Sequence, residues 1–165
     1  MLDGIDHVIR PLTPAQLSFR RAEGEWTAAE IVEHLSIVES GMIRLFQGLA
    51  ERAATRGSVP PAALEIAIDD QYRDSANGKI KTRQQSEPTG NVPAGDSLKT
   101  MRSVQDQLTD LRPRLEQADL SSVSFQHPAL GNLTIGQWLV FFSVHEERHL
   151  RQIASIISSP TFPRP

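Results

Sequence analysis

Residues 27–35 read TAAEIVEHL, and they begin the strongest helix pattern in the chain. Thr27 and Glu30 form a capping box, in which the hydroxyl and the carboxylate each accept a hydrogen bond from a backbone N–H at the helix start. Beyond the box, apolar residues recur at steps of three and four to about Ala54, which is the period of one helix face. His34 lies within this stripe, whose other members are Ile31, Leu35, Val38, Met42, Leu45, Phe46 and Leu49. The pattern predicts a long helix with a histidine on its buried face.

The same design recurs toward the C-terminus. Thr134 and Gln137 form a second capping box, and the helix that follows should reach about Ser158. Two histidines again occupy positions in the apolar stripe, which comprises Ile135, Trp138, Leu139, Phe142, His145, His149, Ile153, Ile156 and Ile157.

Two more helices are predicted between and before these. Asp96 or Ser97 can cap a third long helix, which Pro113 should kink or end near Arg112 because proline lacks the N–H of the helical ladder. A short helix is expected over Leu2–Ile9. The apolar stripe of the third long helix is Leu98, Met101, Val104, Leu108, Leu111 and Leu115.

The other segments are predicted to be connections. Residues 13–25 should be a connector, residues 62–72 a short helix, and residues 73–95 a long polar crossover rich in glycine and proline. His127 falls in a predicted loop, where we expect a surface histidine. No series of strands is recognisable, so three long helices and one shorter element predict an all-α helical bundle.

Composition limits both architecture and partners. The 165 residues fit one domain, and residues 160–165 are expected to be a flexible tail. A net charge of -3 and a pI of about 5.9 argue against nucleic acid as a partner. The chain has no cysteine, which excludes disulfides and protein thiolate ligands. No apolar run approaches the ~20 residues of a membrane span, and no signal peptide is recognisable, so we expect a cytoplasmic protein.

Three histidines are the candidate metal ligands. His145 and His149 are four residues apart, which places both imidazoles on one helix face, as in zinc-binding H-E-x-x-H helices. His34 would add a third imidazole from another helix. Taken singly, such residues are more often solvated or bonded to a carbonyl. Together they indicate a metal site, because burying three unpaired imidazoles would cost several kcal/mol unless a partner compensated them.

Carboxylates near these histidines are candidate catalytic groups. Glu30, one turn before His34, and Glu146 or Glu147 could accept hydrogen bonds from ligating imidazoles or serve as a general base. The alternative is that Glu30 is only the capping carboxylate and that the other two are solvated.

Three segments together resemble a known family. The stretches GEWTAAEIVEHL (residues 24–35), HPALGNLTIGQW (residues 127–138) and HEERHLRQI (residues 145–153) are similar to the DinB/YfiT-like superfamily. The resemblance implies a four-helix bundle with a long crossover, frequent homodimers, and a divalent ion held by His34, His145 and His149. Family members with assigned chemistry include thiol-dependent S-transferases and a mycothiol-dependent isomerase.

Three classes of function remain open from the sequence. The first is a metal-dependent transferase that uses a low-molecular-weight thiol, with a metal-assisted hydrolase based on Glu30 or Glu146 as its nearest alternative. The second is a non-catalytic metal-binding stress-response module, and the third is a metal-free bundle with core histidines. Imidazole ligands favour zinc or nickel, and they also suit iron or copper.

Overall fold

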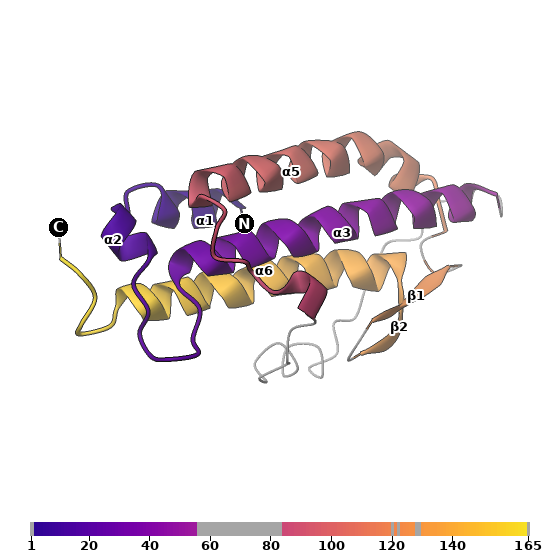
Figure 1. Cartoon of the computed structure of the whole chain (residues 1–165). Helices are drawn as coiled ribbons and strands as arrows, with labels where there is room; N and C mark the ends of the chain where they lie inside the picture. The colour runs from indigo at the N-terminus through magenta and orange to yellow at the C-terminus, as the bar shows by residue number, and fades with distance from the viewer. Residues whose placement is uncertain (1, 56–83, 120, 122, 128–129, 165) are drawn as a thin grey trace. The chain divides into compact units, whose positions relative to one another are not determined.

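The structure is a computed structural model that describes residues 2–55, 84–119, 121, 123–127 and 130–164. Within these ranges the chain is mainly helical, with one small hairpin (Figure 1). The elements in chain order are α1 (Leu2–Ile9), α2 (Pro14–Leu17), α3 (Ala28–Ala54), the 3-10 turn η1 (Gln84–Ser86), α5 (Ala94–Glu116), β1 (Ser124–His127), β2 (Gly131–Thr134) and α6 (Ile135–Ile157).

Both predicted capping boxes are present. At the start of α3, Thr27 N donates to Glu30 Oε2 at 2.7 Å and Glu30 N donates to Thr27 Oγ1 at 3.1 Å. At the start of α6, Thr134 N donates to Gln137 Oε1 at 2.9 Å and Gln137 N donates to Thr134 Oγ1 at 3.3 Å. These bonds satisfy amides that the helix itself leaves without acceptors. The structure confirms the long helices predicted after these two capping boxes, α3 and α6, and the short helix α1.

Two helix boundaries differ from the prediction. Residues 13–25 are not only a connector, because Thr13 and Gln16 form a further capping box that starts the four-residue helix α2. The helix α5 begins at Ala94, before the predicted caps, and it continues through Pro113 to Glu116. Proline is tolerated there because the carbonyl of Thr109, which loses its helical partner, belongs to an exposed residue that water can reach.

The predicted loop before the last helix contains an antiparallel hairpin. Strands β1 and β2 pair Ser124 with Thr134, Phe125 with Leu133 and His127 with Gly131 (Figure 1). Gly131 has a φ of 75°, a left-handed conformation that glycine adopts without steric cost. His127 is 7% exposed, so the expectation of a surface histidine was wrong. Its Nδ1 accepts a hydrogen bond from Leu130 N at 3.1 Å, and its ring lies against Trp138 and Phe141.

The described residues cluster into two compact units, and α3, α5 and α6 each contribute residues to both. The first unit comprises Met1–Ser40, Thr82–Ser103 and Glu146–Pro165. Its core consists of Leu2, Ile5, Ile9, Ala28, Ile31, Val32, Leu35, Ala94, Leu98, Met101, Ile153 and Ile156. Burying each of its Leu, Ile, Val and Met side chains contributes about 1.5–3 kcal/mol.

The C-terminal residues of the first unit are packed. Phe162 lies against the core and meets Phe19 edge to face, with ring centroids 5.4 Å apart. Gln16 Nε2 donates to the carbonyl of Pro163 at 2.9 Å. These contacts place Phe162 and Pro163 against the first unit, whereas the flexibility expected of residues 160–165 stays a prediction.

The second unit comprises Gly41–Lys81 and Val104–His145. Phe46 and Phe142 pack in it with ring centroids 6.3 Å apart, and Trp138 Nε1 donates to the carbonyl of Phe125 at 3.2 Å. That bond fastens the hairpin to α6. None of the helices in the described ranges is long and apolar enough to cross a membrane.

Some predictions fall outside the described ranges. The short helix predicted over 62–72 lies there, as does the crossover before residue 84. The assignment of the whole chain to one domain stays a prediction.

Candidate metal centre

His34, His145 and His149 form a group whose candidate ligand nitrogens all lie within 4.8 Å of one another. His34 is contributed by α3, and the other two histidines stand one turn apart on α6. His34 and His149 are buried, with 4% and 2% of their surfaces exposed, and His145 is half-buried. The helical spacing that predicted this group therefore brings its three imidazoles together.

His34 and His149 belong to the first unit, and their rings meet there. The ring centroids are 4.9 Å apart with an interplanar angle of 64°. Nδ1 of His34 lies 2.7 Å from the carbonyl oxygen of Ser86, and Nδ1 of His149 lies 3.0 Å from Oε1 of Gln152. Because both partners are acceptors, both Nδ1 atoms carry the proton, which makes Nε2 the nitrogen with a lone pair. This is the tautomer of most metal-ligating histidines, whose other ring N–H is held by an oxygen.

The protonation of these rings also suits ligation. Burial, joined by the charges of His34 and Arg148, lowers the pKa of His149 to about 3. Burial is also the main cause that lowers the pKa of His34, opposed by the hydrogen bond to Ser86. Only neutral imidazole binds a metal, and both rings are neutral at physiological pH. The donor set therefore fits a divalent transition metal ion.

Trp26 covers the imidazole pair. Its ring centroid lies 4.8 Å from that of His34 and 6.5 Å from that of His149. Trp26 was not among the candidate site residues of the sequence analysis. The partners Ser86 and Gln152 were also missed. Gln152 follows His149 by three residues, a helical spacing that could have revealed it, whereas Ser86 lies in a polar segment without any periodic pattern.

The carboxylates predicted as catalytic candidates lie in different surroundings. Glu30 is held by the cap of α3 and by Arg20, whose Nη2 donates to Oε1 at 2.7 Å. Burial acts to raise the pKa of Glu30, but the bonds from Arg20 and Thr27 outweigh it and lower that pKa. Glu147 is exposed and lies 4.0 Å from Arg151.

Glu146 is buried instead, with 3% of its surface exposed, and its carboxyl group interacts with that of Glu39. Glu39 is 1% exposed, and neither of its carboxyl oxygens has a hydrogen-bond partner among the described residues. Burial, followed by the charge of Glu146, raises the pKa of Glu39 to about 9, and burial raises the pKa of Glu146. One or both members of this pair therefore hold a proton at neutral pH. The catalytic roles of Glu30 and Glu146 stay predictions.

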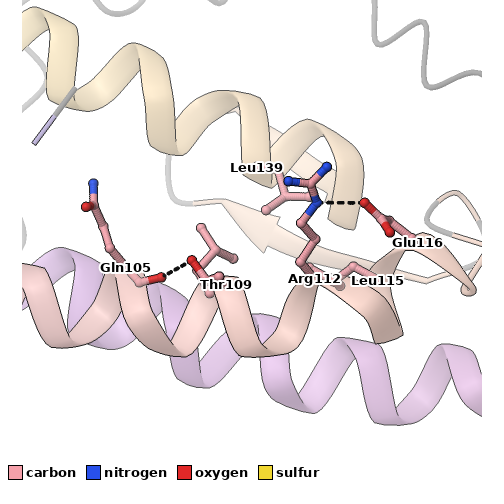
Figure 2. Close-up of a pocket in the computed structure, with 7 residues that line it drawn as sticks. Gln105, Thr109, Arg112, Leu115, Glu116 and Leu139 are labelled. Atoms are coloured by element: carbon pink, nitrogen blue, oxygen red, sulfur yellow. Dashed lines mark hydrogen bonds and ion pairs between the residues drawn. The ribbon is translucent and has the colours of Figure 1, made fainter.

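The second unit has a surface cavity of about 410 Å³, shown in Figure 2. Its apolar wall is formed by Leu108, Leu115 and Leu139. Arg112 and Glu116 also line the cavity, and Arg112 Nε donates to Glu116 Oε1 at 2.6 Å (Figure 2). Both side chains are exposed, so this ion pair contributes little to stability. The cavity lacks the converging titratable groups of the histidine site, which makes the histidine group the stronger candidate.

Comparisons with known proteins identify the family of the chain. The sequence model of the DinB superfamily matches residues 2–153. YuaE of Bacillus subtilis (strain 168) is 27% identical over 149 residues, which cover 90% of this chain and 87% of YuaE. OB0413 of Oceanobacillus iheyensis, provisionally designated a metal-dependent hydrolase, is 24% identical over 155 residues, covering 94% of this chain and 78% of OB0413.

Two solved structures share the fold. TT2238, described as a four-helix bundle protein, has a TM-score of 0.59 and 21% identity, covering 93% of this chain and 89% of that one. YfiT from Bacillus subtilis has a TM-score of 0.62 and 18% identity, covering 94% of this chain and 79% of YfiT. It is provisionally described as a metal-dependent hydrolase with an unusual four-helix bundle topology. The predicted four-helix bundle and the predicted family resemblance are confirmed.

Proposed function

We propose a function from one premise, which is that this chain belongs to the DinB superfamily. The function is that of a metal-dependent enzyme in which His34, His145 and His149 hold a divalent ion that activates a small nucleophile. The observation that carries the proposal is the convergence of three imidazoles within 4.8 Å, two of them buried and held in the ligating tautomer.

When bound, a divalent ion would supply a nucleophile at neutral pH, because it lowers the pKa of a thiol or water that coordinates to it. The chain's own residues prepare the site for such an ion. Ser86 and Gln152 orient the two buried imidazoles through their Nδ1 atoms, and the ring of Trp26 packs beside the pair. His34, His145 and His149 would together hold the ion with three protein ligands, the number that catalytic zinc sites use beside water or substrate.

The first candidate reaction is transfer to a low-molecular-weight thiol. The thiol would come from a cosubstrate, since the chain has no cysteine. The thiol would release its proton to solvent, and its sulfur would form a bond to an electrophilic carbon, from which a leaving group departs with the electron pair of the broken bond. The contacts of the carboxylates favour this reaction over hydrolysis, because hydrolysis usually needs a general base beside the attacking water. Glu30 is occupied by Arg20 and Thr27, and Glu146 is buried against Glu39.

The second candidate is a metal-assisted hydrolase. The provisional descriptions of OB0413 and YfiT favour it. In this reaction Glu146 would serve as the base after losing its proton and turning away from the carboxyl group of Glu39.

The two candidates are separated by activity of the zinc-loaded protein. An aryl halide would be supplied with and without a low-molecular-weight thiol, and a nitrophenyl ester would be supplied without it. Thiol consumption that depends on zinc and is lost in His149→Ala supports the transferase. Ester hydrolysis with the same dependence supports the hydrolase, and stoichiometric zinc binding without either activity supports the non-catalytic module.

Two further features belong to this proposal. Zinc or nickel is the proposed ion on the basis of imidazole ligands, and metal analysis of protein produced without a histidine tag tests it. A homodimer is proposed from the family, and sedimentation of the purified protein tests that.

A further inference from the structure

The carboxyl group of Glu33 binds a segment that is distant in the sequence. Glu33 is 1% exposed, and it precedes the metal-site residue His34 on α3. Its Oε1 accepts hydrogen bonds from Thr89 N at 2.8 Å and from Thr89 Oγ1 at 2.6 Å. Its Oε2 accepts from Gly90 N at 2.9 Å. A charged side chain is almost never so buried without such partners, and here three donors from two consecutive residues provide them.

The same segment supplies the acceptor for His34. The carbonyl of Ser86, three residues before Thr89, lies 2.7 Å from His34 Nδ1. Neighbouring residues of α3 therefore hold the segment 86–90 at two points, one through a carboxylate and one through an imidazole. All of these residues lie within the first unit.

Glu33 is the stronger of the two attachments. Three hydrogen bonds to a carboxylate contribute more than one bond between a neutral imidazole and a carbonyl. The backbone around residues 89 and 90 is exposed, so water would replace these bonds if Glu33 were absent. The position of the Ser86 carbonyl, and with it the orientation and tautomer of His34, then depends on the Glu33 anchor.

We propose that Glu33 is a positioning residue of the metal centre, which acts on His34 through the segment 86–90. The inference rests on the proposed metal-binding function of His34, His145 and His149. Glu33 touches neither the ion nor a substrate. Its role is to keep the Ser86 carbonyl where it fixes Nδ1 of His34 as the donor and leaves Nε2 for the ion.

Zinc affinity of the full chain tests this role. Glu33→Gln keeps the size of the side chain but replaces one acceptor oxygen with an NH₂ group, so it cannot accept all three bonds. We expect zinc affinity to fall about 10–100-fold, the usual effect of losing a group that orients a ligating histidine. Thr89→Val removes one of the three bonds and should lower the affinity about two- to fivefold.

Glu39→Gln is the matched control. Glu39 lies on the same helix with the same 1% exposure, and neither of its carboxyl oxygens has a hydrogen-bond partner in the part of the chain that the structure describes, the segment 86–90 included. Its carboxyl group is already protonated at neutral pH, so glutamine imitates it closely. This variant should keep zinc affinity within about twofold of the wild type, a difference that a typical affinity measurement barely resolves.

Two more measurements separate positioning from general stability. A His34→Ala variant should no longer retain stoichiometric zinc, but His145 and His149 can still bind zinc weakly when it is in excess. Adding Glu33→Gln should change that weak affinity by less than about twofold, because the effect is transmitted through His34. Long-range ¹H–¹⁵N NMR spectra of the metal-free protein should show His34 with the proton on Nδ1, and Glu33→Gln should shift the population toward Nε2–H. A purely structural role of Glu33 would leave that tautomer unchanged.

These measurements can fail separately for the positioning role of Glu33 and for the proposed metal binding. A wild-type chain that binds no zinc contradicts the proposed function, and the tautomer of His34 then decides the role of Glu33 alone. A folded Glu33→Gln variant with wild-type zinc affinity and an unchanged His34 tautomer overturns the inference. If Glu33→Gln fails to fold, Thr89→Val decides: unchanged affinity and tautomer in that variant overturn it equally.

Discussion

Glu33 and Glu39 lie on the same helix and are equally buried, at 1% exposure, yet their surroundings are opposite. Glu33 accepts three hydrogen bonds from Thr89 and Gly90. Neither carboxyl oxygen of Glu39 has a hydrogen-bond partner within the described ranges, and the group interacts with a second buried carboxyl group, that of Glu146. One environment supplies donors to a carboxylate, whereas the other favours a bound proton.

The difference teaches how a helix can bury acidic residues in two ways. Where backbone amides are available, the desolvation cost is offset by hydrogen bonds, and the carboxylate becomes an anchor. Where they are absent, the group keeps a proton, and its pKa rises to about 9. The first environment adjoins the histidine site and organises it. The second lies outside the three-histidine group and lowers stability as pH rises.

The largest expected effect is loss of zinc binding, and it should appear at the histidine site beside Glu33 and not at Glu39. His149→Ala should abolish stoichiometric zinc binding, because losing one of three ligands removes chelation, and His145→Ala should do the same. Glu39→Gln should leave the zinc content intact. Metal analysis after dialysis measures all three variants, and wild-type zinc content in either histidine variant would show that the site is wrong.

A bound ion should stabilise a chain that is already folded. The apolar core of the first unit is extensive, so the metal-free protein should keep its helical circular dichroism at room temperature. Zinc at a hundredfold excess over its Kd should add about 3 kcal/mol by mass action. Melting curves with and without a chelator measure this. Collapse of the helical signal on metal removal would show that the ion is structural.

Loss of the hydrogen bonds of Glu33 should change stability somewhat less than zinc binding does. Glu33→Gln should lower the free energy of unfolding by about 2 kcal/mol, since hydrogen bonds to a charged group contribute roughly 1.5–3 kcal/mol each and water can reach the freed amides. Urea denaturation of the metal-free protein measures the loss without any contribution from the ion. An unchanged midpoint and slope would mean that the segment 86–90 is held by other contacts.

The smallest effect has the opposite sign and depends on pH. The pKa of Glu39 is raised in the folded state, so its contribution to stability is present below the unfolded pKa near 4.5 and is lost as pH rises toward about 9. Glu39→Gln removes this loss. It should therefore stabilise the protein by roughly 1–2 kcal/mol more at pH 6 than at pH 4. Thermal melts of both proteins across that range test this, and equal differences at the two pH values would contradict the buried-acid interpretation.

The sequence predicted the features that depend on local patterns. The capping boxes at Thr27 and Thr134 are read within four residues, and the stripes that contain His34, His145 and His149 are read from helical period alone. The ligand group followed from those stripes because period fixes the buried face.

The features that were missed depend on contacts between distant segments. Ser86 is 52 residues from His34 and lies in a polar stretch with no period, so nothing local marked its carbonyl as a partner. Glu33 and Glu39 were not recognised as buried, because charged residues usually are not. The hairpin was missed because each strand has only four residues, too few for a clear alternation.

The indole of Trp26 has a practical consequence for spectroscopy. It lies 4.8 Å from the ring of His34, close enough for its fluorescence to be quenched by a paramagnetic ion such as nickel or copper at the histidines. The chain has one other tryptophan, Trp138, which belongs to the second unit and donates to Phe125. Replacing Trp138 with phenylalanine would leave a single emitter beside the site. Metal occupancy could then be followed optically in real time without an added dye.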